Sequence, residues 1–258
     1  MPDQTTQLNL NDGGTVGSSF RIEFGSEVNI TGGNVGVGPI VNGGEVNING
    51  GNVSANFQAN SGSLVQISGG AVGDDFIANS GSEVNISGGN LGIFFVADSG
   101  SEVNISGGTL GPIFTVQSGG VVNISGGTFG MFLTADDSEM NIFGAEFFID
   151  GVELDKLTPG QAFTITDRDV TLTALLADGE QQFSLDKRIF SPNAMLTVTL
   201  TSPVLLGDVN IDGVVDLFDI APFIDRLATR TFQAEADIDG SGAVDFLDIA
   251  PFIGLLDQ

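Results

Sequence analysis

Acidic, amide and hydroxyl side chains recur at a fixed spacing in two stretches near the end of the chain, GDVNIDGVVDLFDIAPFI from Gly207 and ADIDGSGAVDFLDIAPFI from Ala236. Such spacing suits calcium, which takes roughly six to eight oxygen ligands from loop positions 1, 3, 5, 7, 9 and 12. Position 6 needs Gly for a sharp turn, and Gly213 and Gly242 occupy it. Position 7 contributes its backbone carbonyl, so its side chain can be apolar. The candidate ligands are Asp208, Asn210, Asp212, Val214 (carbonyl), Asp216 and Asp219, and then Asp237, Asp239, Ser241, Ala243 (carbonyl), Asp245 and Asp248.

The alternative interpretation of these stretches is an acidic, solvated turn region rich in Asp and Asn. The duplication disfavours it, because ligand types, Gly and the following DIAPFI all repeat 29 residues apart. Two features depart from an EF-hand: position 12 is Asp rather than Glu, and SPVLLG before the first loop has no helical pattern. A duplicated calcium loop followed by a helix, without an entering helix, resembles a type I dockerin. The resemblance implies two Ca²⁺ ions and a cohesin domain as the partner.

The segments after the two loops each predict one amphipathic helix. Apolar residues follow the spacing i, i+3, i+4 and i+7. Pro222 and Pro251 are tolerated only in a first turn, so the helices should begin near Ile220 and Ile249, with Asp219 and Asp248 as N-caps. The two apolar faces, which we expect to pack on each other, are Ile220, Phe223, Ile224 and Leu227, and Ile249, Phe252, Ile253 and Leu256.

Two apolar pairs lie outside these helical stripes, at loop positions 10 and 11. They are Leu217 with Phe218, and Phe246 with Leu247. The resemblance implies that these residues contact cohesin, in two orientations related by the internal repeat. The alternative is that they pack against the preceding part of the chain.

Most of the remaining sequence is a repeat. Segments such as GSEVNISGGNL and GSEVNISGGTL recur about every 19 residues up to residue 150. Each unit alternates apolar and polar residues, as in Val84-Asn85-Ile86, which is the period of a half-buried strand. A unit this short predicts three short strands joined by tight turns at Gly. Stacked units bury their apolar columns and pair each strand with the coils above and below. The sequence therefore predicts an all-β parallel β-solenoid of about eight coils.

Three sets of equivalent positions in the repeat have distinct interpretations. The column Phe57, Phe76, Phe95, Phe114 and Leu133 is predicted to lie inside the solenoid. A row of amides from Asn9 to Asn141 is either a stripe that binds sugar hydroxyls or, as we favour, a ladder hydrogen-bonded along the axis. The row of Glu27, Glu45, Glu83, Glu102 and Glu139 is interpreted as a solvated face.

The repeat ends near Ala145, and alternating segments such as VTLTALLADGEQQFSLD then predict more strands. We expect them to cap the open end of the solenoid, whose strand edges are otherwise unpaired. The predicted organisation is a β-solenoid over 1–150, a β-rich cap over 151–205, and a small α-helical, EF-hand-like dockerin module over 206–258.

Composition excludes several classes of function. The chain has no Cys and no His, which excludes disulfides, thiol catalysis and Ser-His-Asp triads. A net charge of −26 argues against nucleic acid and anionic membranes as partners. No apolar run is long enough to span a membrane. Because Met1-Pro2-Asp3-Gln4 is not a signal peptide and a dockerin implies export, we expect a missing upstream segment that carries one.

These observations favour an extracellular or cell-surface protein that acts as a spacer, an adhesin or a polysaccharide-associated component on a cohesin-bearing scaffold. The first alternative is a polysaccharide hydrolase or lyase, because parallel β-helices are a common fold of pectin lyases and polygalacturonases. Its candidate acids are Asp74 and Asp75, and the only base before residue 150 is Arg21. The second alternative is a calcium-binding surface protein without a cohesin partner. The interpretation leans toward a protein without catalytic residues.

Overall fold

A computed structural model describes residues 6–130, 133–154, 157–167, 169–177, 182–186, 190–201, 206–209, 215–229, 236, 238 and 244–256. Contacts between Cα atoms divide the chain into two compact units, Met1–Thr201 and Ser202–Gln258. Each unit is described by itself. The division of the first unit at residue 150 stays a prediction.

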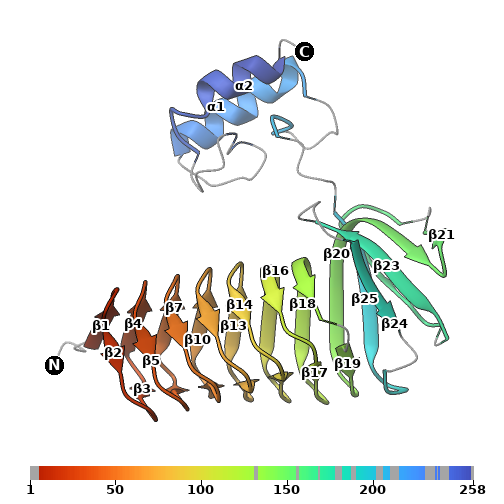
Figure 1. The fold of residues 1–258 in the computed structure, drawn as a ribbon. Helices are drawn as coiled ribbons and strands as arrows, with labels where there is room; N and C mark the ends of the chain where they lie inside the picture. The colour runs from red at the N-terminus through yellow and green to blue at the C-terminus, as the bar shows by residue number, and fades with distance from the viewer. Residues whose placement is uncertain are drawn as a thin grey trace. The chain divides into compact units, whose positions relative to one another are not determined.

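The first unit is a parallel β-solenoid in which equivalent strands of successive coils form three ladders (Figure 1). The first ladder contains β1 (Thr6–Leu10), β4 (Ser26–Ile30), β7 (Glu45–Ile48), β10 (Leu64–Ile67), β13 (Glu83–Ile86), β16 (Glu102–Leu110), β18 (Val121–Phe129) and β20 (Glu139–Ile149). The second contains β2 (Thr15–Val16), β5 (Asn34–Val35), β8 (Asn52–Val53), β11 (Ala71–Val72) and β14 (Asn90–Leu91), and continues in the later halves of β16 and β18. The third contains β3 (Arg21–Glu23), β6 (Ile40–Asn42), β9 (Gln58–Ala59), β12 (Phe76–Ala78), β15 (Phe95–Ala97), β17 (Phe114–Val116) and β19 (Leu133–Ala135).

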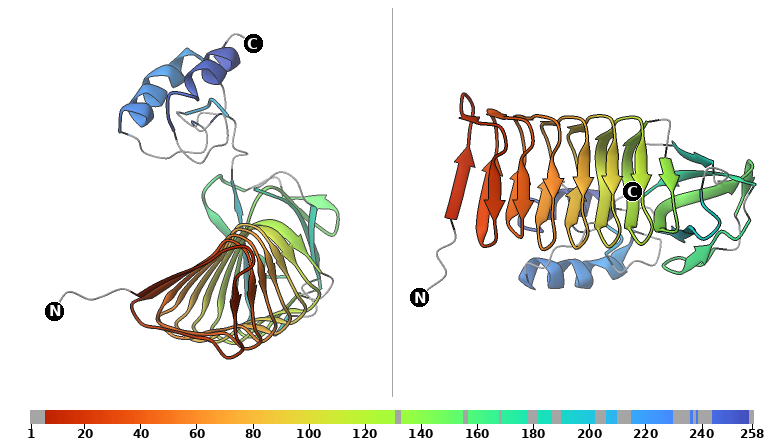
Figure 2. Two further views of the ribbon diagram at one scale, coloured as in Figure 1. Left: turned by 60° about the vertical axis from the view of Figure 1, so that its left-hand side comes forward. Right: turned by 90° about the horizontal axis from the view of Figure 1, so that it is seen from below.

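The register between coils follows the sequence repeat, and successive coils lie one behind another along the stack (Figure 2). Val65 pairs with Val84 and Ile67 pairs with Ile86, for example. Glycine makes this close stacking possible. A Cβ at Gly69 would lie 2.5 Å from the carbonyl oxygen of the preceding coil, and Gly70 has a φ of +78°. The predicted solenoid is confirmed, with about seven coils of roughly 19 residues rather than eight. In the described chain the third ladder has seven strands, and β20 leads into the cap instead of completing another coil.

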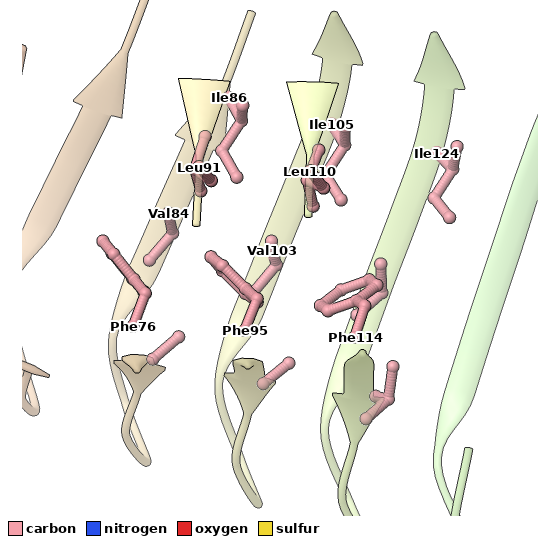
Figure 3. Packing of buried hydrophobic residues seen from close by; sticks show 14 of the residues in the cluster. Phe76, Val84, Ile86, Leu91, Phe95, Val103, Ile105, Leu110, Phe114 and Ile124 are labelled. Atoms are coloured by element: carbon pink, nitrogen blue, oxygen red, sulfur yellow. The ribbon is translucent and has the colours of Figure 1, made fainter. Parts of the chain in front are cut away.

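The solenoid core consists of stacked columns of identical or similar side chains (Figure 3). The predicted phenylalanine column is inside: Phe57, Phe76, Phe95 and Phe114 are at most 2% exposed. The rings of Phe57 and Phe76 stack with their centroids 4.7 Å apart, and those of Phe76 and Phe95 at 4.8 Å. Offset-stacked rings at this spacing contribute beyond their burial, so the column ties each coil to the next.

The end of the solenoid after β20 is covered by strands that are not part of the repeat. β25 (Met195–Leu200) continues the first ladder by pairing parallel to β20. The antiparallel strands β21 (Val152–Glu153) and β23 (Thr171–Leu176) also pair with β20, while β22 (Ala162–Thr164) pairs with β25 and β24 (Gln182–Asp186) with β23. Buried side chains of these strands, such as Leu172 and Leu196, belong to the same core as the coils. They therefore cover the apolar columns that the last coil would otherwise expose.

The second unit contains a short 3₁₀ turn, η2 (Leu217–Asp219), and two helices, α1 (Ile220–Thr229) and α2 (Ile249–Leu256). The helices lie side by side (Figure 1), and the rings of Phe223 and Phe252 stack across them with centroids 4.1 Å apart. Both helices begin where the prolines predicted. The expected pairing of apolar faces is correct for Phe223 and Phe252 but wrong for Ile224 and Ile253, which are 56% and 53% exposed.

Candidate metal and partner-binding site

Each predicted calcium loop ends in a compact turn held by two of its own carboxylates. In the first loop, the backbone N–H of Asp216 donates to Asp219 Oδ2 at 2.9 Å, and the N–H of Phe218 donates to Asp216 Oδ1 at 2.7 Å. The second loop repeats both bonds at 2.8 Å, from Asp245 to Asp248 Oδ2 and from Leu247 to Asp245 Oδ1. The local sequence D-x-x-D is thus a reciprocal capping box that fixes the start of each helix.

This geometry adds a 3₁₀ turn and its cap before the first predicted helix. Asp216 is the N-cap of the turn that leads into α1, and Asp219 is the third residue of that turn. Asp219 Oδ2 reaches back and accepts the backbone N–H of Asp216. The sequence analysis placed the start of α1 correctly but did not include the 3₁₀ turn before it.

Three of the loop carboxylates are the most deeply buried acids among the residues that the structure describes. Asp219 and Asp248 are fully buried, and Asp208 is 4% exposed. Buried carboxylates are costly unless they are paired with a positive charge or coordinate a metal. Oxygen-only ligands held in a loop are the set that calcium prefers. The residues described therefore fit a hard cation at these positions.

The ligand set as a whole remains a prediction. Seven of the candidate ligands lie outside the described residues: Asn210, Asp212, Val214, Asp237, Asp239, Ser241 and Ala243. Within the described residues, no three acidic side chains come together at one candidate metal site.

The predicted partner-binding residues all lie on the surface. Leu217 and Phe218 are 73% and 77% exposed, and Phe246 and Leu247 are 77% and 68% exposed. The capping boxes hold them there, because Phe218 and Leu247 donate their backbone N–H groups to the box carboxylates. Their side chains are therefore fixed outward at the start of each helix.

Ile224 and Ile253 are the apolar surface residues that the sequence analysis missed. They lie one to two helical turns after the exposed apolar pairs at loop positions 10 and 11. Their spacing fitted the apolar face that was predicted to be buried between the two helices. The short length of the two predicted helices was the feature of the sequence that could have indicated this exposure. Two helices of 10 and 8 residues that meet through Phe223 and Phe252 bury only a narrow stripe.

Most of the amide row of the solenoid is hydrogen-bonded along the axis, as we favoured. Asn104 donates to Asn85 at 2.9 Å, and Asn123 donates to Asn104 at 2.7 Å. A second amide ladder, unnoticed in the sequence, runs through Asn42, Asn60 and Asn79, with bonds of 2.7 and 2.8 Å. The aligned spacing of these three residues could have revealed it.

Asp74 and Asp75, the acids of the enzymatic alternative, lie exposed in a turn between the second and third ladders. Asp74 Oδ1 accepts the backbone N–H of Ile93 in the next coil at 2.9 Å. Asp75 has a φ of +60°, in the left-handed region that Asp tolerates. Both acids thus have an evident part in the turn.

Residues 206–256 match the family described as the dockerin type I domain. The resemblance drawn from the paired loops is therefore confirmed for this part of the chain. Dockerin type I domains generally bind calcium and attach to cohesin domains. Proteins of this kind are typically extracellular or associated with the cell surface.

No curated protein and no solved structure matched the chain. Among the residues described, no helix is both long and apolar enough to cross a membrane.

Proposed function

We propose that this chain is an extracellular β-solenoid protein attached through its calcium-dependent dockerin module to a cohesin-bearing scaffold or cell surface. In this assembly the solenoid serves as a spacer, an adhesin or a polysaccharide-associated component. The observation that carries the proposal is the duplicated apolar surface at the start of α1 and α2. Four large apolar side chains, each at least 68% exposed, directly precede the buried acids Asp219 and Asp248.

The chemistry of this surface supports a protein partner. Exposed aromatic and aliphatic residues that are held rigidly favour a hydrophobic contact, and such residues dominate the binding energy of interfaces. The capping boxes place this surface next to the predicted calcium ligands. Calcium binding and partner binding are then coupled, because the same loops order both.

The proposal is tested by measuring the binding of the full chain to a panel of immobilised cohesin domains in calcium and in EDTA. We expect saturable binding in calcium and its loss in EDTA. A second variant, Asp216→Ala/Asp245→Ala, removes from each loop a carboxylate that is both a predicted calcium ligand and part of the capping box, and should weaken binding even in calcium. Calcium uptake without binding to any cohesin would instead favour the alternative of a calcium-binding surface protein with no cohesin partner.

The enzymatic alternative is tested separately. It requires release of reducing sugars or unsaturated uronides from plant polysaccharides, and a loss of that activity in Asp74→Asn/Asp75→Asn. The hydrogen bond from Ile93 to Asp74 favours a structural part for this pair, so we retain attachment as the function.

A further inference from the structure

One coil of the solenoid departs from the repeat at two outward-facing positions. β10 pairs in register with β7 and β13, yet it carries Leu64 where both neighbours have Glu and Gln66 where both have Asn. Its inward-facing residues, Val65 and Ile67, keep the residue types of the repeat and are buried. The two exceptions therefore change only the outer surface of the coil, and packing of the core does not require them.

Gln66 interrupts the amide ladder at this coil. Along most of the ladder an asparagine amide donates to the equivalent amide of the preceding coil, as from Asn104 to Asn85 at 2.9 Å. Gln66 Nε2 donates instead to Glu45 Oε1 at 3.1 Å, because its extra methylene carries the amide past the line of the ladder. Among the hydrogen bonds of the described residues, none is donated to the side-chain oxygens of Gln66 and Asn47. Two amide acceptors therefore face solvent at the interruption.

Two hollows of the outer surface meet at this coil. One of about 330 Å³ is lined by amide and hydroxyl groups, including those of Asn47, Gln66 and Ser68. The other, of about 340 Å³, is lined by Leu64, Phe24 and several glycines. They are adjacent, since Leu64 and Gln66 are consecutive outward-facing residues of β10. Each volume is at the lower end of the range for small-molecule sites, roughly 300–1,000 Å³.

The second hollow presents an aromatic ring to solvent. Phe24 is 83% exposed, more than any other large apolar residue identified as exposed. Its ring lies over Gly43, where an added Cβ would be 3.0 Å from a ring carbon. The glycine thus leaves room for the ring beside the mouth of the hollow. Leu64 adds a half-buried aliphatic group at the point where the row of glutamates is interrupted.

We propose that the outer face around β10 binds a neutral polysaccharide or oligosaccharide chain. Sugar hydroxyls are hydrogen-bond donors that suit the side-chain oxygens of Gln66, Asn47 and Glu45. The C–H faces of the sugar rings suit Phe24 and Leu64. Glu27 and Glu45 line the second hollow, and the chain has a net charge of −26. This charge repels uronic acids and selects a ligand without charge. The site is independent of the cohesin attachment, although a scaffold-bound protein would use it to hold polysaccharide near the scaffold.

The test compares the full chain with a variant whose exceptional coil is restored to the repeat, Leu64→Glu/Gln66→Asn. Binding of cellohexaose, xylohexaose, mannohexaose and hexagalacturonate is measured by titration calorimetry. We expect at least one neutral hexasaccharide to bind the wild type. The variant with the restored coil should bind the same hexasaccharide at least tenfold more weakly. Phe24→Ala should also weaken binding. The restored coil should fold, because neighbouring coils carry the same residues.

Two matched controls address the specificity of these effects. Val121→Glu makes the same change as Leu64→Glu, in the coil of β18 and away from the hollows, and should leave binding unchanged. Phe94→Ala removes another exposed aromatic, 42% exposed on a different corner of the solenoid, and should also have no effect. The proposal is overturned if the wild type binds none of the neutral hexasaccharides, binds only hexagalacturonate, or binds as tightly after the coil is restored. Binding of the same preparations to cohesin is measured in parallel. A protein that binds cohesin but no neutral hexasaccharide contradicts the polysaccharide site and leaves the proposed attachment intact.

Discussion

Phe95 is held between two other rings in the centre of the solenoid. It is 2% exposed, stacks on Phe76 at 4.8 Å, and meets Phe114 edge-on at 5.0 Å. Phe95→Ala would leave a cavity that cannot collapse, because hydrogen-bonded coils on both sides fix its walls. We expect a loss of about 3–5 kcal/mol in the free energy of unfolding, measured by chemical denaturation.

The adjacent residue provides the control for this prediction. Phe94 is 42% exposed, and Phe94→Ala should change the free energy of unfolding by roughly 0.5 kcal/mol or less. A loss below about 1 kcal/mol for Phe95→Ala would contradict the enclosed column, since a fully buried ring costs more to remove.

Asp137 joins the last coil to the cap through its side chain. Ser191 Oγ donates to Asp137 Oδ1 at 2.6 Å, and Asn193 Nδ2 donates to Oδ2 at 3.2 Å. The hydrogen bonds from Ser191 and then Asn193 hold the pKa of Asp137 below its ordinary value of 3.8. Because the folded-state pKa is lowered, this contribution to stability is present above 3.8 and is lost as the pH falls through the folded-state pKa.

We therefore expect acid to weaken the contact between the cap and the last coil before it destabilises the coils themselves. The variant Asp137→Asn keeps the shape of the side chain but removes its charge. Its unfolding midpoint should be lower than that of the wild type at neutral pH, and the difference should shrink as the pH is lowered below 3.8. A difference that stays constant across this pH range would show that the charge has no part in the contact.

The two predicted calcium loops share the geometry of their described ends. Each has a buried acid at its last position, Asp219 and Asp248, held by the backbone N–H of the residue three positions earlier. We expect the full chain to bind two calcium ions, and Asp219→Asn or Asp248→Asn to leave one. The reason is that each change removes a negative ligand from one loop only. Titration calorimetry gives the number of ions, and a wild-type value of one or zero contradicts the prediction.

The accuracy of the sequence analysis differed among the elements. The coils were predictable because their period, register and glycine turns repeat, so each coil supports the same inference for the next. The pairing of the cap strands was not predictable, because β20, β23 and β25 occur once and pair in both directions. Pairing in such strands is decided by packing between distant segments.

The details of the helical unit were predictable only in part. The prolines fixed where the helices begin, and the aromatic residues Phe223 and Phe252 identified the shared core. The exposure of Ile224 was not predictable, because a helical stripe shows which side chains share a face but not how wide the covered part is. The capping role of Asp216 was missed since the same carboxylate had been interpreted only as a metal ligand.

At the scale of the molecule, the two units have separate cores. The larger core contains the solenoid columns and the cap, and the smaller one contains Val209, Phe223, Ala236, Val244 and Phe252. Removal of calcium should therefore unfold the helical unit and leave the solenoid folded, because only the former has predicted metal ligands. Circular dichroism in EDTA should lose the helical signal and keep the strand signal. Simultaneous loss of both would show that the units fold as one.

The duplicated surface of the helical unit leads to a prediction about the whole assembly. Phe218 and Phe246 occupy equivalent positions, and both are 77% exposed. A cohesin that uses either copy can bind in two orientations, so Phe218→Ala alone removes one orientation and should weaken binding only about twofold, by roughly 0.4 kcal/mol. Phe218→Ala/Phe246→Ala removes the anchor from both and should abolish measurable binding.

Calcium uptake separates a docking role from a structural role in this experiment. Neither aromatic side chain belongs to the small core formed around Phe223 and Phe252, so the double variant should still bind two ions with unchanged affinity. Phe223→Ala is the contrasting variant: it removes half of the 4.1 Å ring stack and should impair calcium uptake together with cohesin binding. If the double variant loses calcium as Phe223→Ala does, the exposed phenylalanines stabilise the fold, and the partner must bind elsewhere.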